Sequence, residues 1–174
     1  MWLTNWTTSQ GNVTYLSFKS SQAYPTPCFV KKKWDDVETF TTLQWQLISI
    51  ETKEGKYWTE IIFNVVDQWD KYVVQFWINN NLTTSILNSL SGVEKFNYIE
   101  ISCYSKDWFW RVKVKTSTDW NVFTDASWKY TVEEIKALTK KVKVNGSDVT
   151  DKTDLFEVMI NGMIPDINMA LESF

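Results

Sequence analysis

The chain contains no histidine and is poor in glycine and proline. Without histidine, Ser-His-Asp and Cys-His catalysis, histidine metal sites and histidine pH switches are excluded. The 5 glycines are scattered, so no glycine-rich phosphate loop can form. Low glycine and proline content also argues against a disordered chain. We therefore expect a folded protein that is not an enzyme and that uses no cofactor.

Long apolar runs and paired cysteines are missing as well. The apolar runs are short, as at 61–63, so none spans a bilayer, and we expect no membrane partner. The residues after Met1 show neither the basic nor the apolar region of a secretory signal, which predicts a cytoplasmic protein. Cys28 and Cys103 lie far apart among β-forming residues, so we expect two small buried side chains.

Tryptophan, by contrast, is abundant, and charge is unevenly spread. The 11 tryptophans exceed what a core of this size needs, so several rings should lie at the surface and contact sugars, bases or another protein. Residues 1–116 carry 12 Lys+Arg and 11 Asp+Glu, whereas residues 117–174 carry 6 and 10. The sequence therefore predicts a locally basic body followed by an acidic region.

Alternating apolar and polar residues predict five strands in the middle of the chain. These strands are expected over 43–50, 57–67, 71–79, 96–104 and 108–115. The alternation slips near Leu47, which indicates a β-bulge. A helical stripe over Leu82–Leu90 lies between the third and fourth strands.

This order predicts a mainly β fold, a five-stranded Greek-key barrel with a helix between strands three and four. It is the oligonucleotide/oligosaccharide-binding (OB) fold, and we assign it to residues 41–116. Residues 1–40 should form an N-terminal arm and a short strand pair, over Val13–Lys19 and 28–34. Residues 117–174 should form an acidic extension with a hairpin at Asn145-Gly146 and a helix that Pro165 stops.

Cations and aromatic rings share the outward faces of the predicted barrel. On the fifth strand, Phe109, Arg111 and Lys113 alternate with Trp110, which we place in the core. The OB fold sets this strand beside the third, which would bring the cations next to Trp77. Such a groove holds phosphates by lysine and stacks bases on rings. The candidate DNA-binding residues are Lys53, Lys56, Trp58, Lys71, Trp77, Lys106, Trp108, Phe109, Arg111 and Lys113.

The chain resembles the OB-fold single-stranded-DNA-binding proteins of tailed bacteriophages. The resemblance lies in the order and texture of segments 15–19, 47–57, 71–76, 85–90 and 143–147 and of the acidic amphipathic helix that follows. It implies sequence-independent protection of single-stranded DNA during phage replication or recombination, in the host cytoplasm. It also implies contact with replication proteins through an acidic C-terminal region.

Other functions remain open at this stage. Exposed aromatics and the acidic region also suit a protein–protein interaction module, such as a phage factor acting on a host protein. Tryptophan-rich faces suit a carbohydrate-binding β-domain as well. The carboxylates of Asp35, Asp36, Asp67 and Asp70 form no spaced cluster on one element, which argues against a metal site. The sequence is compatible with a homo-oligomer.

Overall fold

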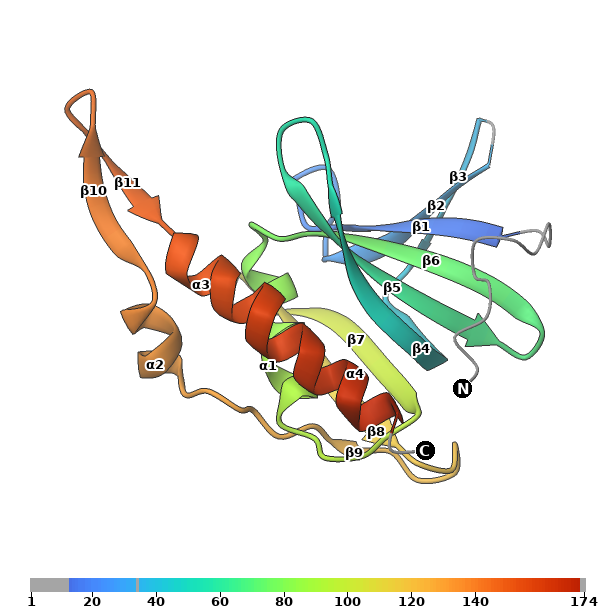
Figure 1. Ribbon diagram of the computed structural model, residues 1–174. Coiled ribbons are helices and arrows are strands. Elements are labelled where there is room, and N and C mark those ends of the chain that lie inside the picture. Colours follow the sequence, from blue (N-terminus) through green and yellow to red (C-terminus); the bar gives the residue numbers. More distant parts are fainter. Residues whose placement is uncertain (1–12, 34, 173–174) are drawn as a thin grey trace.

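A computed structural model describes residues 13–33 and 35–172. Within these residues, nine strands form one mixed sheet in the order β3-β2-β1-β6-β5-β4-β7-β8-β9, and a separate hairpin pairs β10 with β11 (Figure 1). The strands are β1 Val13–Lys19, β2 Cys28–Lys33, β3 Asp36–Phe40, β4 Thr42–Glu54, β5 Thr59–Asp67, β6 Asp70–Trp77, β7 Tyr98–Lys106, β8 Phe109–Ser117, β9 Thr124–Asp125, β10 Lys140–Val144 and β11 Ser147–Asp151. The helices are α1 Asn81–Ser91, α2 Val132–Ala137, α3 Thr153–Val158, the π-helical η1 Met159–Met163 and α4 Ile164–Glu172.

The predicted OB-fold barrel is wrong. Its five strand segments and its helix segment are present as β4, β5, β6, α1, β7 and β8, but closure would require β6 beside β8. Instead, three strands separate them, and β6 pairs in parallel with β1. Alternation predicts which residues form a strand and which face they share. It does not reveal that the strand pair before residue 41 supplies the partner of β6.

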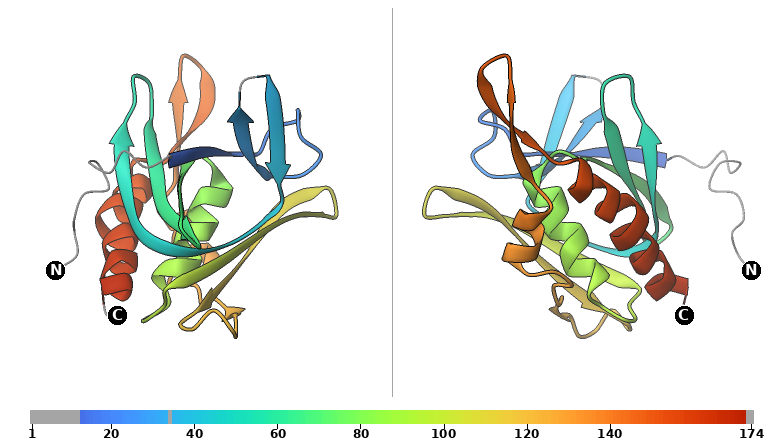
Figure 2. Two further views of the ribbon diagram at one scale, coloured as in Figure 1. Left: turned by 90° about the vertical axis from the view of Figure 1, so that its right-hand side faces the viewer. Right: turned by 60° about the vertical axis from the view of Figure 1, so that its left-hand side comes forward.

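The sheet curls strongly although it does not close. Figure 2 shows the β7–β8 end bending round toward the connection between β1 and β2. Between these two parts, the Ser105 hydroxyl donates a hydrogen bond to the Pro25 carbonyl at 3.4 Å. The curl therefore brings two distant ends of one open sheet together at a rim.

The bend in β4 arises where the sequence predicts a β-bulge. The register between β4 and β5 shifts between Leu47 and Ser49. β4 pairs with β7 only over 42–46, so its later residues lose a neighbour on that edge. Helix α4 packs there, and the side-chain amide of Asn168 exchanges two hydrogen bonds with the backbone of Ile50.

The core lies between the concave side of the sheet and the helices α1 and 153–172. Helix α1 packs against β8 and α4, which brings residues from most of the chain into one cluster. The largest fully buried side chains include Phe29, Phe63, Phe76 and Phe96. Cys28 and Cys103 are both buried and free, as predicted. Within the described residues, no helix combines the length and apolar character needed to cross a membrane.

The C-terminal hairpin forms as predicted, but the final helix does not stop at Pro165. Asn145 and Gly146 take the positive φ angles that a two-residue hairpin turn requires, 51° and 81°. The helix runs from Thr153 to Glu172, with a π-helical turn immediately before Ile164. The Ile164 N–H bonds to the carbonyl of Met159, five residues back. We attribute the tolerance of Pro165 to this wider turn, which relieves the usual clash of proline with the preceding turn.

Candidate nucleic-acid interface

Two of the predicted site residues lie in a hollow on the convex face of the sheet. Side chains alternate along β6, so Lys71, Gln75 and Trp77 share this outer face. Lys53 and Lys71 line a hollow of about 540 Å³, together with Tyr15 and Gln75, which we call the sheet hollow. Its lining within the described residues includes one acid, Glu51. The convex face therefore combines lysines with a polar, partly aromatic surface.

Three aromatic rings form a ladder at the end of β6. The ring centroids of Tyr57 and Trp58 lie 5.9 Å apart, and those of Trp58 and Trp77 lie 4.9 Å apart. All three rings remain accessible, with exposed fractions of 74%, 45% and 48%. The ammonium of Lys56 lies over Tyr57 and that of Lys19 over Trp77, at 5.1 and 5.4 Å from the centroids. This aromatic ladder is thus a row of exposed rings with a cation near each end.

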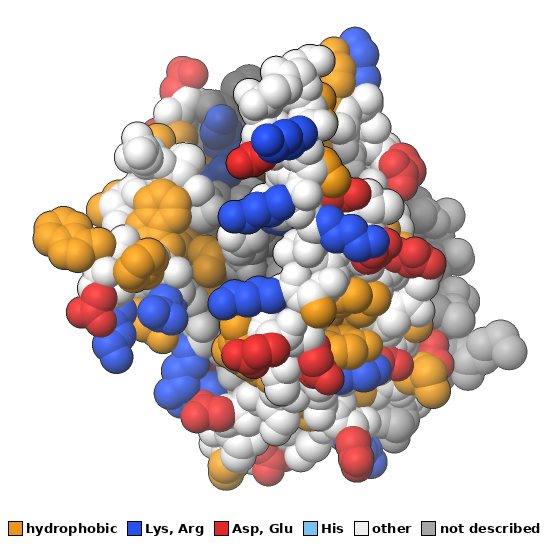
Figure 3. Space-filling view, turned by 90° about the vertical axis from the view of Figure 1, so that its left-hand side faces the viewer, with side chains coloured by type: hydrophobic (Ala, Val, Ile, Leu, Met, Phe, Trp, Pro, Cys, Tyr) orange, Lys and Arg blue, Asp and Glu red, His pale blue; other side chains and the backbone are white. Residues whose placement is uncertain are grey.

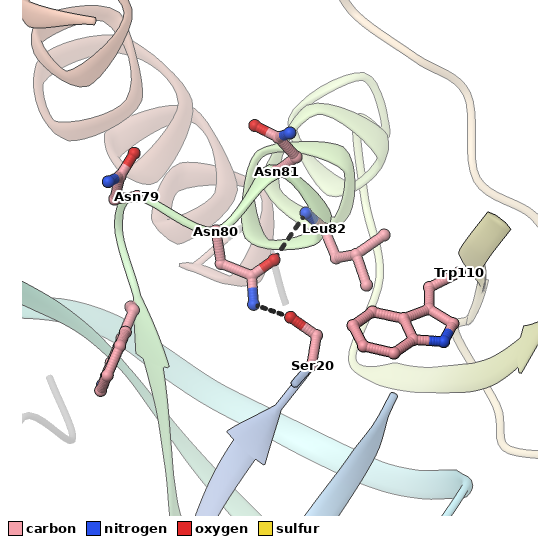
Figure 4. A pocket seen from close by; sticks show the side chains of 7 residues that line it. Ser20, Asn79, Asn80, Asn81, Leu82 and Trp110 are labelled. Carbon is pink, nitrogen blue, oxygen red and sulfur yellow. Dashed lines mark hydrogen bonds between the residues drawn. The ribbon is translucent and has the colours of Figure 1, made fainter. Parts of the chain in front are cut away.

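Trp77 also borders a second hollow, which we call the Trp hollow. Its volume is about 430 Å³, and it lies between Trp77, Trp110 and the segment 79–82. The Asn80 side chain holds this segment in place, because its amide donates to the Ser20 hydroxyl at 2.7 Å and accepts from the Leu82 N–H at 3.0 Å (Figure 4). Figure 4 shows Trp110 across the hollow from Asn80. Among the described residues that line it, none is acidic.

A third hollow lies next to the second, and Asn81 is in the lining of both. This helix hollow has a volume of about 490 Å³ and lies between α1, α2 and the base of the β10–β11 hairpin. Lys136, Lys152 and Trp128 line it, and its described lining again holds no acid. Figure 3 views the molecule from the side on which the hairpin projects, and it shows a row of basic side chains beside a recess and a hydrophobic cluster. Cations and rings therefore face each other across a hollowed surface.

The other predicted residues line none of these three hollows. Lys106, Trp108 and Phe109 lie at the β7–β8 turn, where the fully exposed Trp108 takes a φ of +67°. Arg111 and Lys113 lie on the face of β8 opposite Trp110, and Lys113 pairs with Asp125 at 3.6 Å. The predicted pairing of this strand with the strand of Trp77 is wrong, because β5, β4 and β7 intervene.

Sequence reasoning also missed several residues of these hollows. Trp110, expected in the core, is half-buried and lines the Trp hollow. Lys136 and Lys152 were not predicted as site residues, because residues 117–174 taken together carry a net negative charge. A narrower window finds them, since residues 136–152 carry five lysines and two aspartates. Lys19 reaches Trp77 only because β1 lies parallel beside β6.

The described residues also bear on metal binding and on thiol chemistry. Among them, no group of three His, Cys, Asp or Glu side chains could hold a metal ion. Burial raises the pKa of the Cys28 and Cys103 thiols, which keeps both protonated and makes them poor nucleophiles.

The resemblance to phage single-strand binders stays a prediction without support from relatives. Comparison of the chain with protein-family models, with curated proteins and with solved structures finds no match.

Proposed function

We propose that this protein binds single-stranded DNA without sequence preference, along the convex face of its sheet and into the Trp hollow. The observation that carries the proposal is the aromatic ladder Tyr57–Trp58–Trp77, with lysines at both ends. Aromatic rings stack on any base and contribute about 1–3 kcal/mol per base, which suits binding that ignores sequence.

The support for this function comes from exposed rings and lysines and not from the fold, because the predicted OB barrel is wrong. Lysines line the sheet hollow and the helix hollow and flank the aromatic ladder, at Lys53, Lys71, Lys136, Lys152, Lys19 and Lys56. Cations of this kind hold phosphates and release counterions, so the affinity should fall as salt rises. The acid-free lining of the Trp hollow and the helix hollow favours an anionic ligand over a cationic one.

A labelled oligo-dT and fluorescence anisotropy test the proposal at several salt concentrations. Trp58→Ala and Trp77→Ala should each weaken binding by about 1–3 kcal/mol, roughly 5- to 150-fold, if each ring stacks on a base. Trp69→Ala is the matched control, since Trp69 is 94% exposed in the turn at the opposite end of β6. Absence of oligo-dT binding by the wild-type protein at low salt would reject the proposal.

A protein partner is the second candidate, and one observation favours it. Trp108 is fully exposed at the tip of the β7–β8 turn and lines none of the three hollows. Exposed tryptophans are frequent anchors in protein interfaces. If Trp108→Ala abolishes copurification of one stoichiometric protein and leaves oligo-dT binding intact, the protein has this second surface.

A further inference from the structure

We propose that Lys152 and the helix hollow hold a backbone phosphate of the same single strand that stacks on the aromatic ladder. This inference rests on the proposed function and deepens it by assigning a phosphate site that lies outside the predicted barrel. The ligand is a phosphodiester, and the site lies next to the Trp hollow, with Asn81 in the lining of both.

The Lys152 ammonium is partly buried, and its hydrogen-bond partner carries no charge. It donates to the Asn81 side-chain oxygen at 2.9 Å, which is a neutral partner. Burial lowers the pKa of Lys152, and no nearby charge contributes to that shift. A partly desolvated cation that lacks a counter-charge attracts an anion more strongly than an exposed one.

The acids nearest to Lys152 in the sequence are engaged elsewhere. The Asp151 carboxylate accepts hydrogen bonds from the N–H and the hydroxyl of Thr153, at 3.0 and 2.7 Å. The Asp154 carboxylate pairs with Lys140 at 3.1 Å. Neither carboxylate forms an ion pair with Lys152, whose described hydrogen-bond partner is the neutral Asn81.

The hairpin adds further cations on the side that faces the hollow. Thr150 lines the hollow, and Lys141 pairs with it across the strands, so their side chains share one face of the hairpin. Lys136, on α2, completes this side. Figure 3 shows the row of basic side chains beside the recess. Lys140 lies on the opposite face of the hairpin, where it is already paired.

The position of the site fits a strand that continues from the ladder. Trp77 belongs both to the ladder and to the Trp hollow, and Asn81, which accepts a hydrogen bond from Lys152, lines both the Trp hollow and the helix hollow. Trp128, which also lines the helix hollow, offers one more exposed ring near the proposed phosphate site. The strand would therefore pass ring, cation and ring in turn, which is the arrangement of single-strand grooves.

The test is the salt dependence of oligo-dT binding by Lys152→Gln, Lys152→Arg and the control Lys140→Gln. Each phosphate contact contributes about 0.7 to the slope of log affinity against log salt for single strands. Lys152→Gln should lower the magnitude of the slope by about that amount, while Lys152→Arg and Lys140→Gln keep the wild-type slope. Circular dichroism of each variant confirms that the fold is retained.

An unchanged slope in Lys152→Gln, with Trp77→Ala still weakened, would overturn this inference and leave the proposed function standing. No binding by the wild-type protein would overturn both. Nuclear magnetic resonance of the Asn81 side-chain amide identifies the ligand. Shifts caused by oligo-dT support the proposal. Shifts caused only by inorganic pyrophosphate, or equally by poly-glutamate, would overturn it in favour of a free phosphate or an acidic peptide.

Discussion

Asn168 satisfies both backbone polar groups of Ile50. Its side-chain oxygen accepts from the Ile50 N–H at 2.9 Å, and its nitrogen donates to the Ile50 carbonyl at 2.8 Å, across 118 residues of sequence. An amide on α4 thus stands in for the strand that β4 lacks beyond its pairing with β7. This explains why the last helix packs on a strand from the first third of the chain.

The first prediction concerns Asn168→Ala, which removes both hydrogen bonds and leaves the Ile50 groups unsatisfied. We expect the free energy of unfolding to fall by about 1–3 kcal/mol, measured by urea denaturation. Asn161→Ala is the control, since Asn161 is exposed on the same helical stretch. Equal stability of the two variants would mean that α4 does not depend on this amide for its position.

The second prediction concerns Gly92, at the C-terminal cap of α1. A Cβ at this position would overlap the carbonyl oxygen of Ser127, which belongs to the backbone and has little freedom to move. Gly92→Ala should therefore lower the melting temperature and cost about 1–3 kcal/mol or more. Gly162→Ala is the contrasting variant, because its Cβ would meet Val158 at an ordinary 3.9 Å. It should be neutral or stabilising by up to about 1 kcal/mol, since alanine favours helices.

The third prediction separates binding from stability at Lys152. The pKa of this lysine is lower in the folded state than its ordinary value of 10.5, so the fold disfavours its charged form. The resulting penalty is present at pH values below the folded pKa and disappears as pH rises above the unfolded value. Lys152→Gln should thus be as stable as the wild type or more stable at pH 7 in urea denaturation. A clear loss of stability would show that the Lys152–Asn81 hydrogen bond outweighs the desolvation.

The fourth prediction concerns the Cys103 thiol, whose pKa is raised to about 12, mainly by burial. The unfolded chain loses the thiol proton near pH 9, whereas the fold keeps it. The free energy of unfolding should fall as pH rises between these values, by at most about 1.4 kcal/mol per pH unit for this group. In Cys103→Ala, the stability curve should be flatter over the same range. At pH 8, Cys103 should react with a thiol reagent only after unfolding.

Local structure followed from the sequence wherever neighbouring residues decide it. The strand residues of β1, β5 and β6, the bulge near Leu47 and the Asn145-Gly146 turn all come from patterns a few residues long. The pairing of β1 with β6 comes from contacts between distant residues, and no local pattern indicates it. The helix end predicted at Pro165 was wrong, because the π-helical turn that accommodates this proline has no clear sequence signal.

The candidate site was predicted in part for the same reason. Alternation placed Trp58 and Trp77 on the same face of neighbouring strands, and their rings do lie together, with Lys56 in the turn before Trp58 as expected. Arg111 and Lys113 depended on the wrong strand order and lie elsewhere. Lys152 depends on the return of the C-terminal segment to α1, which only the whole fold determines.

The parallel pairing of β1 with β6 sets an order of events during synthesis. β1, β2 and β3 leave the ribosome together, but the partner of the free edge of β1 follows only after β4 and β5. Until then, the nascent chain presents an open strand edge, which is a template for aggregation. Pairing Val13 with Lys71 also closes a long loop, and the entropy lost in that closure must be met before the hydrogen bonds between the strands form. Chaperone dependence during expression should therefore be greatest for chains that stop short of residue 77.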